Sequence, residues 1–414
     1  MADGADHPFV YDIERYLTIR AAYGASLGPD GTLSFLLDTT GVPQVWTLEQ
    51  PQGWPTQQTF ADEPIAFASA SPERPERIFG MDEGGNERQQ LYRLDADGQI
   101  LPLTDRPDAK HRWGGWSSDG ERFAFASNAR DESVFDVYVQ HRDAVPSSPG
   151  TDPTAVADRV HEGDGWLSVA GWSPDDTRLA VVESHWSFDQ DVYTLDVETG
   201  ELIHRTPHED DVRFYSISWG PAGEALYCVT DYERDTLGLA RLDVTADAVS
   251  SLDDALEFVM TDEQWNVDGI ALDEESGRFV TSTNVDGYTE LTVGEFTGPT
   301  EYETLPTPKL PGGIAGGVSW GPDADRFALS VTGRTINTNV FVVEAATGDV
   351  TRWTAASSAG IPRSTFVEPS VVRFESFDGR EIPALFSLPE GTETGGTPVV
   401  VDVHGGPESQ RRPS

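Results

Sequence analysis

The sequence predicts a mainly β protein: a seven-bladed β-propeller over residues 20–365, followed by the beginning of a second domain. One unit recurs seven times, and it consists of an apolar strand, a turn rich in Pro, Asp and Gly, and a second apolar strand. The copies are 43 to 56 residues apart. Four short strands in about 40–50 residues make up one propeller blade, so seven copies indicate seven blades.

The turn is the most regular part of the repeat. Its equivalent positions are Pro29, Pro72, Ser118, Pro174, Pro221, Glu274 and Pro322. In four copies a tryptophan stands shortly before the turn, at Trp116, Trp172, Trp219 and Trp320. A third apolar strand follows each copy, for example at 136–139 and 191–195. A β-sandwich with evenly spaced turns is the alternative, but a sandwich gives no reason to repeat a tryptophan before the same turn.

The charge of the chain excludes one large class of partners. Asp and Glu number 71 against 28 Lys and Arg, which gives a formal net charge of −43. Phosphate recognition requires a basic surface, so we expect no nucleic-acid partner. The 11 Trp, 11 Tyr and 19 Phe supply more aromatic surface than a disordered acidic chain carries, and they predict a packed core.

Compartment and cofactors follow from what the sequence contains. Cys228 is the single cysteine, which excludes an intrachain disulfide and a cysteine-rich zinc site. The first residues lack the basic and apolar regions of a signal peptide, and no apolar run approaches the ~20 residues of a membrane span. We therefore expect a cytoplasmic protein with no membrane partner, and the sequence indicates no metal or organic cofactor.

A short segment, residues 1–19, precedes the predicted propeller. The repeat stops near Phe366. The runs 371–377 and 382–388 flank an Asp378-Gly379 turn and predict a β-hairpin. The valine-rich run 399–403 predicts a buried strand. Residues 366–414 are therefore expected to begin a second domain.

His404-Gly405-Gly406-Pro407 follows this valine run and resembles the oxyanion-hole loop of α/β-hydrolases. Glycines let backbone N–H groups approach a developing negative oxygen without a Cβ in the way. A glycine turn after an ordinary strand is the alternative reading of the four residues.

The order of these parts resembles the prolyl-oligopeptidase family of serine peptidases, most closely its acylaminoacyl-peptidase branch. The resemblance rests on the propeller, on the motifs at 82–92 and 376–384, and on 401–408. It implies that 366–414 begins an α/β-hydrolase domain and that short peptides are the substrates. It also implies that Gly406 supplies an oxyanion N–H, with Gly405 and Pro407 shaping the loop and His404 positioning it. His404 is not the family's triad histidine.

The sequence departs from the family after His404. Ser409 and Ser414 are the only later serines and neither lies in Gly-x-Ser-x-Gly, so the nucleophile and the Asp and His of the triad are missing. We expect this chain alone to be inactive, as a truncated part of a peptidase. The alternatives are a non-enzymatic propeller that binds a partner, and one half of a split peptidase completed by a C-terminal hydrolase polypeptide.

Two other segments match the nucleophile pattern Gly-x-Ser-x-Gly, at Ser26 and Ser319. A nucleophile elbow connects a strand to a helix. Both matches instead precede the repeat turn and run into another strand, so we expect both serines to be structural.

Two polar clusters also invite interpretation. His208-Glu-Asp-Asp211 offers oxygen ligands to a divalent cation, although an acidic inter-blade loop is expected in so acidic a chain. Asp82-Glu83 with Asn86-Glu87 offers carboxylates to a substrate amine, against the alternative of an ordinary blade hairpin. The pattern assigns no role to His161 or His185.

The charge predicts a requirement for salt. Lys110 and Lys309 are the only lysines, and the composition is typical of adaptation to molar salt. At about 1 M salt the screening length is roughly 3 Å, so the self-repulsion of the chain fades. We expect the circular dichroism of the folded chain to be lost on dialysis from 2–3 M KCl into dilute buffer. A folded spectrum in dilute buffer would contradict this.

Overall fold

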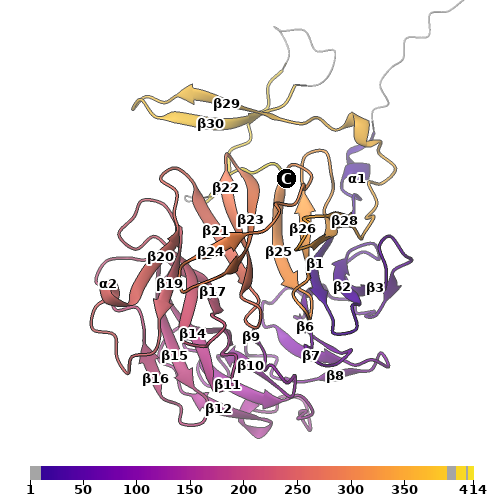
Figure 1. The fold of residues 1–414 in the computed structure, drawn as a ribbon. Coiled ribbons are helices and arrows are strands. Elements are labelled where there is room, and N and C mark those ends of the chain that lie inside the picture. The colour runs from indigo at the N-terminus through magenta and orange to yellow at the C-terminus, as the bar shows by residue number, and fades with distance from the viewer. Residues whose placement is uncertain (1–10, 389–397, 407–408) are drawn as a thin grey trace, which may run out of the picture.

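The computed structural model describes residues 11–388, 398–406 and 409–414, and in them it contains seven four-stranded antiparallel sheets and one two-stranded sheet. The seven larger sheets surround a common axis as the blades of a propeller (Figure 1). In each blade the four strands are consecutive in the chain and pair in that order. The prediction of a seven-bladed propeller is therefore confirmed.

The strands of blades 1 to 4 follow the predicted repeat. They are β1 (Ala22–Leu27), β2 (Leu33–Leu37), β3 (Gln44–Leu48), β4 (Thr56–Gln57), β5 (Ile65–Ala70), β6 (Arg77–Met81), β7 (Gln90–Leu94), β8 (Ile100–Pro102), β9 (His111–Trp116), β10 (Arg122–Ser127), β11 (Asp136–His141), β12 (Ala157–His161), β13 (Leu167–Trp172), β14 (Arg178–Trp186), β15 (Asp189–Asp196) and β16 (Leu202–His204).

Blades 5 to 7 and the final hairpin complete the strands. They are β17 (Phe214–Trp219), β18 (Ala225–Thr230), β19 (Gly238–Asp243), β20 (Leu256–Met260), β21 (Asn266–Leu272), β22 (Arg278–Val285), β23 (Tyr288–Phe296), β24 (Tyr302–Thr304), β25 (Ile314–Trp320), β26 (Arg326–Thr332), β27 (Asn339–Glu344), β28 (Val350–Arg352), β29 (Ser370–Glu375) and β30 (Glu381–Phe386). The helices are short: α1 (Ile13–Tyr16), α2 (Leu252–Ala255), and the 3-10 turns Pro153–Ala155 and Arg363–Thr365. None of the helices in the described ranges is long and apolar enough to cross a membrane.

Each of the seven interfaces between neighbouring blades holds one hydrophobic cluster within the described part of the chain. The cluster between blades 3 and 4, for example, joins Phe135 and Val137 to Val169, Leu179 and Leu195, all of them buried. The apolar residues of the second and third strands supply most of these contacts. The propeller therefore has its core between its blades, in seven separate parts.

The innermost strands are irregular at equivalent places. The pairing of each first strand with its second strand shifts register at a bulge, in all seven blades of the described structure. At these bulges Gly24, Gly115 and Gly317 have φ of +63°, +104° and +65°, and Ser216 has +51°. Glycine adopts such φ values without the steric cost of a Cβ, and a bulge re-aims the groups around it.

The repeated tryptophans join one blade to the one before it. The indole Nε1–H of each donates to a backbone carbonyl of the preceding innermost strand: Trp116 to Ser69 O at 3.4 Å, Trp172 to Gly115 O at 3.1 Å, Trp219 to Gly171 O at 3.3 Å and Trp320 to Ala271 O at 3.1 Å. The arginine that begins the second strand adds a further link. Arg178 donates to Gly223 O of the next blade at 2.6 Å, and its guanidinium lies 4.9 Å from the Trp219 ring centroid.

The ring closes between blade 7 and blade 1, where the indigo and orange strands lie side by side (Figure 1). Neither sheet takes a strand from the other. Instead, Phe35 and Leu33 of blade 1 share a cluster with Val340 and Trp353 of blade 7. Backbone N–H groups add links, from Ala22 to Thr338 O at 3.0 Å among others. Side-chain packing therefore closes the ring.

Of the two predictions for the last segment, the structure confirms one and contradicts the other. The hairpin is confirmed, since β29 and β30 pair antiparallel around Gly379, whose φ is +83°. The predicted buried strand at 399–403 is wrong: these residues form no strand, and Val400 is 93% exposed. A valine-rich strand is buried only where neighbouring strands and helices cover it, and among the described residues nothing covers these valines.

The indole links give a test of how the blades are joined. Trp172→Phe removes the hydrogen bond to Gly115 O and leaves a small cavity. We therefore expect the free energy of unfolding, measured by urea titration in 3 M KCl, to fall by about 1–3 kcal/mol. The matched control is Trp54→Phe, because Trp54 is 94% exposed and its replacement should change stability little. Equal stability of both variants would contradict the proposed role of the indole.

Candidate functional site

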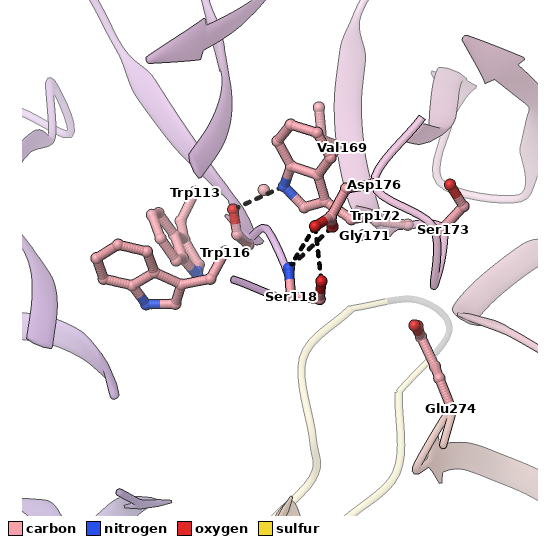
Figure 2. Close-up of a pocket in the computed structure, with 12 residues that line it drawn as sticks. Trp113, Trp116, Ser118, Val169, Gly171, Trp172, Ser173, Asp176 and Glu274 are labelled. Carbon is pink, nitrogen blue, oxygen red and sulfur yellow. Dashed lines mark hydrogen bonds between the residues drawn. The ribbon is translucent and has the colours of Figure 1, made fainter. Parts of the chain in front are cut away.

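A cavity of about 340 Å³ lies between blades 3 and 4, beside the repeat turns of these blades (Figure 2). Its walls come from β9 and β13 and from the turns that follow them. Three indoles line it, those of Trp113, Trp116 and Trp172. Because the bulges bend both strands here, backbone and aromatic faces border the same space. The cavity is a hollow of mixed polar and aromatic character.

The turn residues bring two acids and a hydroxyl to this cavity. Asp176 accepts hydrogen bonds from the backbone N–H of Ser118 at 2.8 Å and from its hydroxyl at 2.6 Å. Glu274 enters from the turn of blade 6, at the repeat position where proline stands in five other copies (Figure 2). Three turns that are far apart in the sequence therefore contribute to one cavity.

The environment of Glu274 favours its neutral form. Burial, together with the nearby carboxylates of Asp273 and Asp176, raises the pKa of Glu274 to about 8. The backbone N–H of Trp219 acts in the opposite direction and does not offset these effects. At neutral pH the Glu274 carboxyl is thus largely protonated, and Asp176 lines the same cavity. Such a pair with indole walls suits an amine or another cationic group.

The described residues of this cavity do not form a hydrolytic centre. The Ser118 hydroxyl is bonded to a carboxylate oxygen and not to a base, and no histidine is among the described residues that line the cavity. A serine nucleophile needs an adjacent general base to accept its proton. The arrangement can bind, but it offers no activated nucleophile.

The two serines that match the nucleophile pattern are interblade links. The Oγ of Ser26 accepts from the backbone N–H of Ala70 at 3.0 Å, and the Oγ of Ser319 accepts from that of Leu27 at 3.4 Å. Ser216 joins blade 5 to blade 6 in the same way, through Ile270 N at 2.9 Å. These are the three interfaces at which no repeat tryptophan is present. The structural interpretation of Ser26 and Ser319 agrees with these contacts.

The predicted oxyanion residues lie in an exposed segment without regular structure. The Nδ1 of His404 lies 3.0 Å from the carbonyl oxygen of Gly405, and Gly406 has a φ of +139°. Among the described residues other than its two chain neighbours, none has an atom within 4 Å of the position that a Cβ on Gly405 would take. Pro407 lies outside the described residues. The backbone N–H groups of the loop are thus not engaged by a surrounding fold in the described structure.

Contacts on blade 6 hold the ends of this segment. Arg412 donates to Asp268 Oδ2 and to Gly287 O, both at 2.8 Å, and to Thr289 Oγ1 at 3.0 Å. Before the hairpin, Glu368 accepts from the Tyr288 hydroxyl at 3.2 Å. The turn between β22 and β23 is therefore the common attachment point. It lies at the opposite end of β22 from Glu274.

The remaining polar residues divide between surface and interior. In the 82–87 hairpin, Asp82 accepts from the Glu87 backbone N–H at 2.8 Å, and Glu87 lies 3.3 Å from Lys110 Nζ; these are surface contacts. In the 208–211 segment the three acids are exposed, while His208 turns inward to Asp189 at 2.9 Å. The acids of 209–211 do not converge with His208, which agrees with the expected acidic inter-blade loop and not with the alternative of a cation site.

Sequence reasoning missed two features. The first is the cavity with Glu274, for which the replacement of the turn proline by glutamate was an available signal. The second is His185, which had no assigned role and lies 2.9 Å from Asp191. No local sequence pattern predicts that contact, because it depends on the register between β14 and β15.

Comparison of the sequence with family models and with curated proteins finds no match. Comparison of the structure finds similar folds. A prolyl endopeptidase is similar at a TM-score of 0.71 with 14% identity, over 92% of this chain and 56% of that protein. Prolyl oligopeptidase B from Galerina marginata has a TM-score of 0.67 with 13% identity, over 92% and 57%. Puromycin hydrolase has a TM-score of 0.68 with 14% identity, over 89% and 58%.

These likenesses concern the fold, since the sequences are distant. The chain spans a little more than half the length of each protein. The propeller of this chain thus resembles the propellers of peptidases and of a hydrolase.

The raised pKa of Glu274 predicts a pH dependence of stability. The carboxyl keeps its proton in the folded state up to about pH 8, whereas it loses it near pH 4.5 when unfolded. Between these values the unfolded state binds fewer protons, so the wild type loses stability as pH rises. Glu274→Gln should remove this loss, with a relative gain that grows from pH 5 to 8 to the order of 2 kcal/mol.

Urea titrations in 3 M KCl at several pH values measure this difference. Glu275→Gln is the matched control, because Glu275 is the exposed neighbour in the same turn. A gain that is independent of pH, or one that Glu275→Gln shares, would show that the Glu274 carboxyl does not titrate as described.

Proposed function

We propose that this chain is the propeller-bearing part of a serine peptidase of the prolyl-oligopeptidase type. The observation that carries the proposal is the order of parts along one chain. A seven-bladed propeller is followed by the β29–β30 hairpin and then by His404-Gly405-Gly406. The likeness to solved prolyl oligopeptidases over 92% of the chain supports the proposal. The substrates would be short peptides, through release of acyl-amino acids or dipeptides, in a salt-rich cytoplasm.

In this proposal the chain supplies access control and electrostatic stabilisation. The propeller limits which peptides reach the reaction centre. The backbone N–H of Gly406 would donate to the oxyanion that forms when a serine attacks the scissile carbonyl. Gly405 and His404 would shape the loop. Because the described segment is exposed, we infer that the loop takes its working form only when hydrolase strands and helices surround it.

The nucleophile, its base and the orienting acid would come from hydrolase sequence other than these 414 residues. The two matches to the nucleophile pattern join blades, at Ser26 and Ser319, so neither serves as nucleophile. We therefore propose that the chain by itself does not hydrolyse peptides. A complementing hydrolase polypeptide, or an in-frame continuation of the gene, would complete the enzyme.

Two measurements test this proposal directly. The first is the DNA sequence beyond the codon for Ser414, which should contain Gly-x-Ser-x-Gly followed by Asp and His codons. The second is hydrolysis of acyl-amino-acid and dipeptide nitroanilides in 3 M KCl, absent for the chain alone and present when the hydrolase polypeptide is added. A chain that instead retains a folded partner protein, with no such hydrolase sequence nearby, would identify a binding module.

The oxyanion role of Gly406 predicts a specific kinetic effect. An added Cβ at Gly406 would hinder the close approach of the loop backbone, and so of its N–H group, to the oxyanion. In the completed enzyme, Gly406→Ala should lower kcat by about 100-fold with little change in KM, as for the loss of one oxyanion donor. Gly379→Ala is the control, since Gly379 also has a positive φ but lies in the hairpin turn. Equal kcat values for the two variants would contradict the role.

A further inference from the structure

Blade 4 gathers imidazoles and carboxylates that the proposed function does not use. The Nε2 of His185, on β14, lies 2.9 Å from Oδ2 of Asp191, on β15. The Nε2 of His204, on β16, lies 2.7 Å from Oδ1 of the same carboxylate. Three adjacent strands of one sheet thus bring two ring nitrogens to the two oxygens of one side chain.

A further acid, Glu183, lies close to His185 and Asp191. The carboxylate of Glu183, on β14, lies with the ligand atoms of His185 and Asp191 so that all three are within 4.8 Å of one another. Its Oε2 accepts a hydrogen bond from the Tyr193 hydroxyl at 3.0 Å. We call Glu183, His185 and Asp191 the blade 4 cluster; His204 adjoins it through its contact with Asp191.

The register of the sheet holds the cluster on one face. Glu183 pairs directly with Asp191, and Tyr193 pairs with His204. Since side chains two residues apart in a strand share a face, the donors of all three strands point the same way. The His204 ring also stacks on Tyr193, at 4.8 Å between centroids and 24° between planes. The donor arrangement therefore comes from backbone pairing, which is rigid.

A fifth side chain supports the cluster from behind. His208 is buried, with Nδ1 2.6 Å from Thr206 O and Nε2 2.9 Å from Asp189 Oδ1. Its Nδ1 also lies 3.5 Å from Asp191 Oδ1. Both of its nitrogens face protein oxygens, so His208 positions Asp191 and offers no free lone pair to an ion.

We propose that the blade 4 cluster binds one divalent transition-metal ion of the Zn²⁺ type. Imidazole nitrogen with carboxylate oxygen is a donor set that Zn²⁺ and its neighbours prefer, whereas Mg²⁺ and Ca²⁺ prefer oxygen alone. Around a tetrahedral Zn²⁺ with ligands near 2.0–2.1 Å, ligand atoms lie about 3.3 Å apart. The present nitrogen-to-oxygen separations differ from this by about half an ångström, which small side-chain rotations provide.

The exposure of the cluster fits such a site. The Asp191 side chain is 15% exposed, whereas His185 and His204 are 41% and 37% exposed. An ion would thus be held from the protein side by a largely buried carboxylate and would keep an open side for water. It would also connect β14 to β15, so we expect it to stabilise blade 4. This inference does not depend on the peptidase proposal.

The experiment uses the untagged chain in 2 M KCl, freed of metal by chelation and dialysis. Co²⁺ is the spectroscopic probe, because its visible absorption reports nitrogen ligation, and Zn²⁺ displaces it. We expect one Co²⁺ per chain, a rise in melting temperature with Zn²⁺, and no displacement by 10 mM Mg²⁺ or Ca²⁺.

Variants locate the site. His185→Gln and Asp191→Asn should each weaken Co²⁺ binding at least tenfold. His141→Gln is the matched control: it removes an exposed imidazole that also lies near acids, 3.5 Å from Glu121, and should change affinity less than twofold. Circular dichroism confirms that each variant is folded, and the wild-type spectrum decides the case if a cluster variant does not fold.

Three results would overturn the proposal. The first is the lack of Co²⁺ and Zn²⁺ binding by the wild type up to 1 mM. The second is binding that His185→Gln and Asp191→Asn leave unchanged. The third is displacement by Mg²⁺ or Ca²⁺ at equal concentration, which would assign the ion to surface carboxylates.

Discussion

Seven sheets that share no strand must be held in one ring, and this constraint underlies most of the structure. A sheet joined to its neighbour through a strand would have a ladder of hydrogen bonds across the interface. Here each blade is a separate meander, so side chains must supply the contact. The seven hydrophobic clusters supply the area, and indole, guanidinium and serine hydroxyl groups supply the direction. The hydrophobic effect is not directional, so the polar links set how each blade is placed.

The same constraint explains features that otherwise suggest catalysis. Each innermost strand offers a carbonyl or hydroxyl to the next blade, in several blades at its bulge, as at Gly115 and Ser216. Where the next blade lacks the repeat tryptophan, a serine takes over the link, as Ser319 does toward Leu27. A glycine two residues before such a serine, Gly24 or Gly317, adopts the positive φ that the bulge requires. A nucleophile pattern thus arises from the needs of blade attachment.

Attachment also shapes the two sites at opposite ends of β22. At one end, the repeat turns of three blades converge, and Glu274 and Asp176 meet in a cavity walled by indoles. At the other, Arg412 and Glu368 fasten the segment that carries His404 and Gly406. The first site is built by the propeller itself. The second site is only attached to the propeller, at the two ends of its segment. The loop between these attachments is therefore exposed.

Periodicity determined the propeller, because the repeat is local: each strand and turn of a blade lies within about 50 residues, and the hydrophobic pattern of each predicts its own pairing. The hairpin at Gly379 was predictable for the same reason. The valine run at 399–403 was wrongly predicted to be a buried strand, because such a strand forms only beside neighbours that its own sequence does not contain. The composition predicted an acidic surface, but it could not show which acidic residues lie near one another.

The candidate sites depended on tertiary structure in proportion to the distance between their residues. His404 to Gly406 could be recognised as a contiguous motif. Glu274 could be noticed as an odd residue in a turn, but its meeting with Asp176 required the ring. The contacts of His185 and His204 with Asp191 arise from the register of three strands, and a shift of one residue would direct these side chains to opposite faces. The sequence by itself thus determined the repeat and the motif, and only the packed blades decided which polar groups meet.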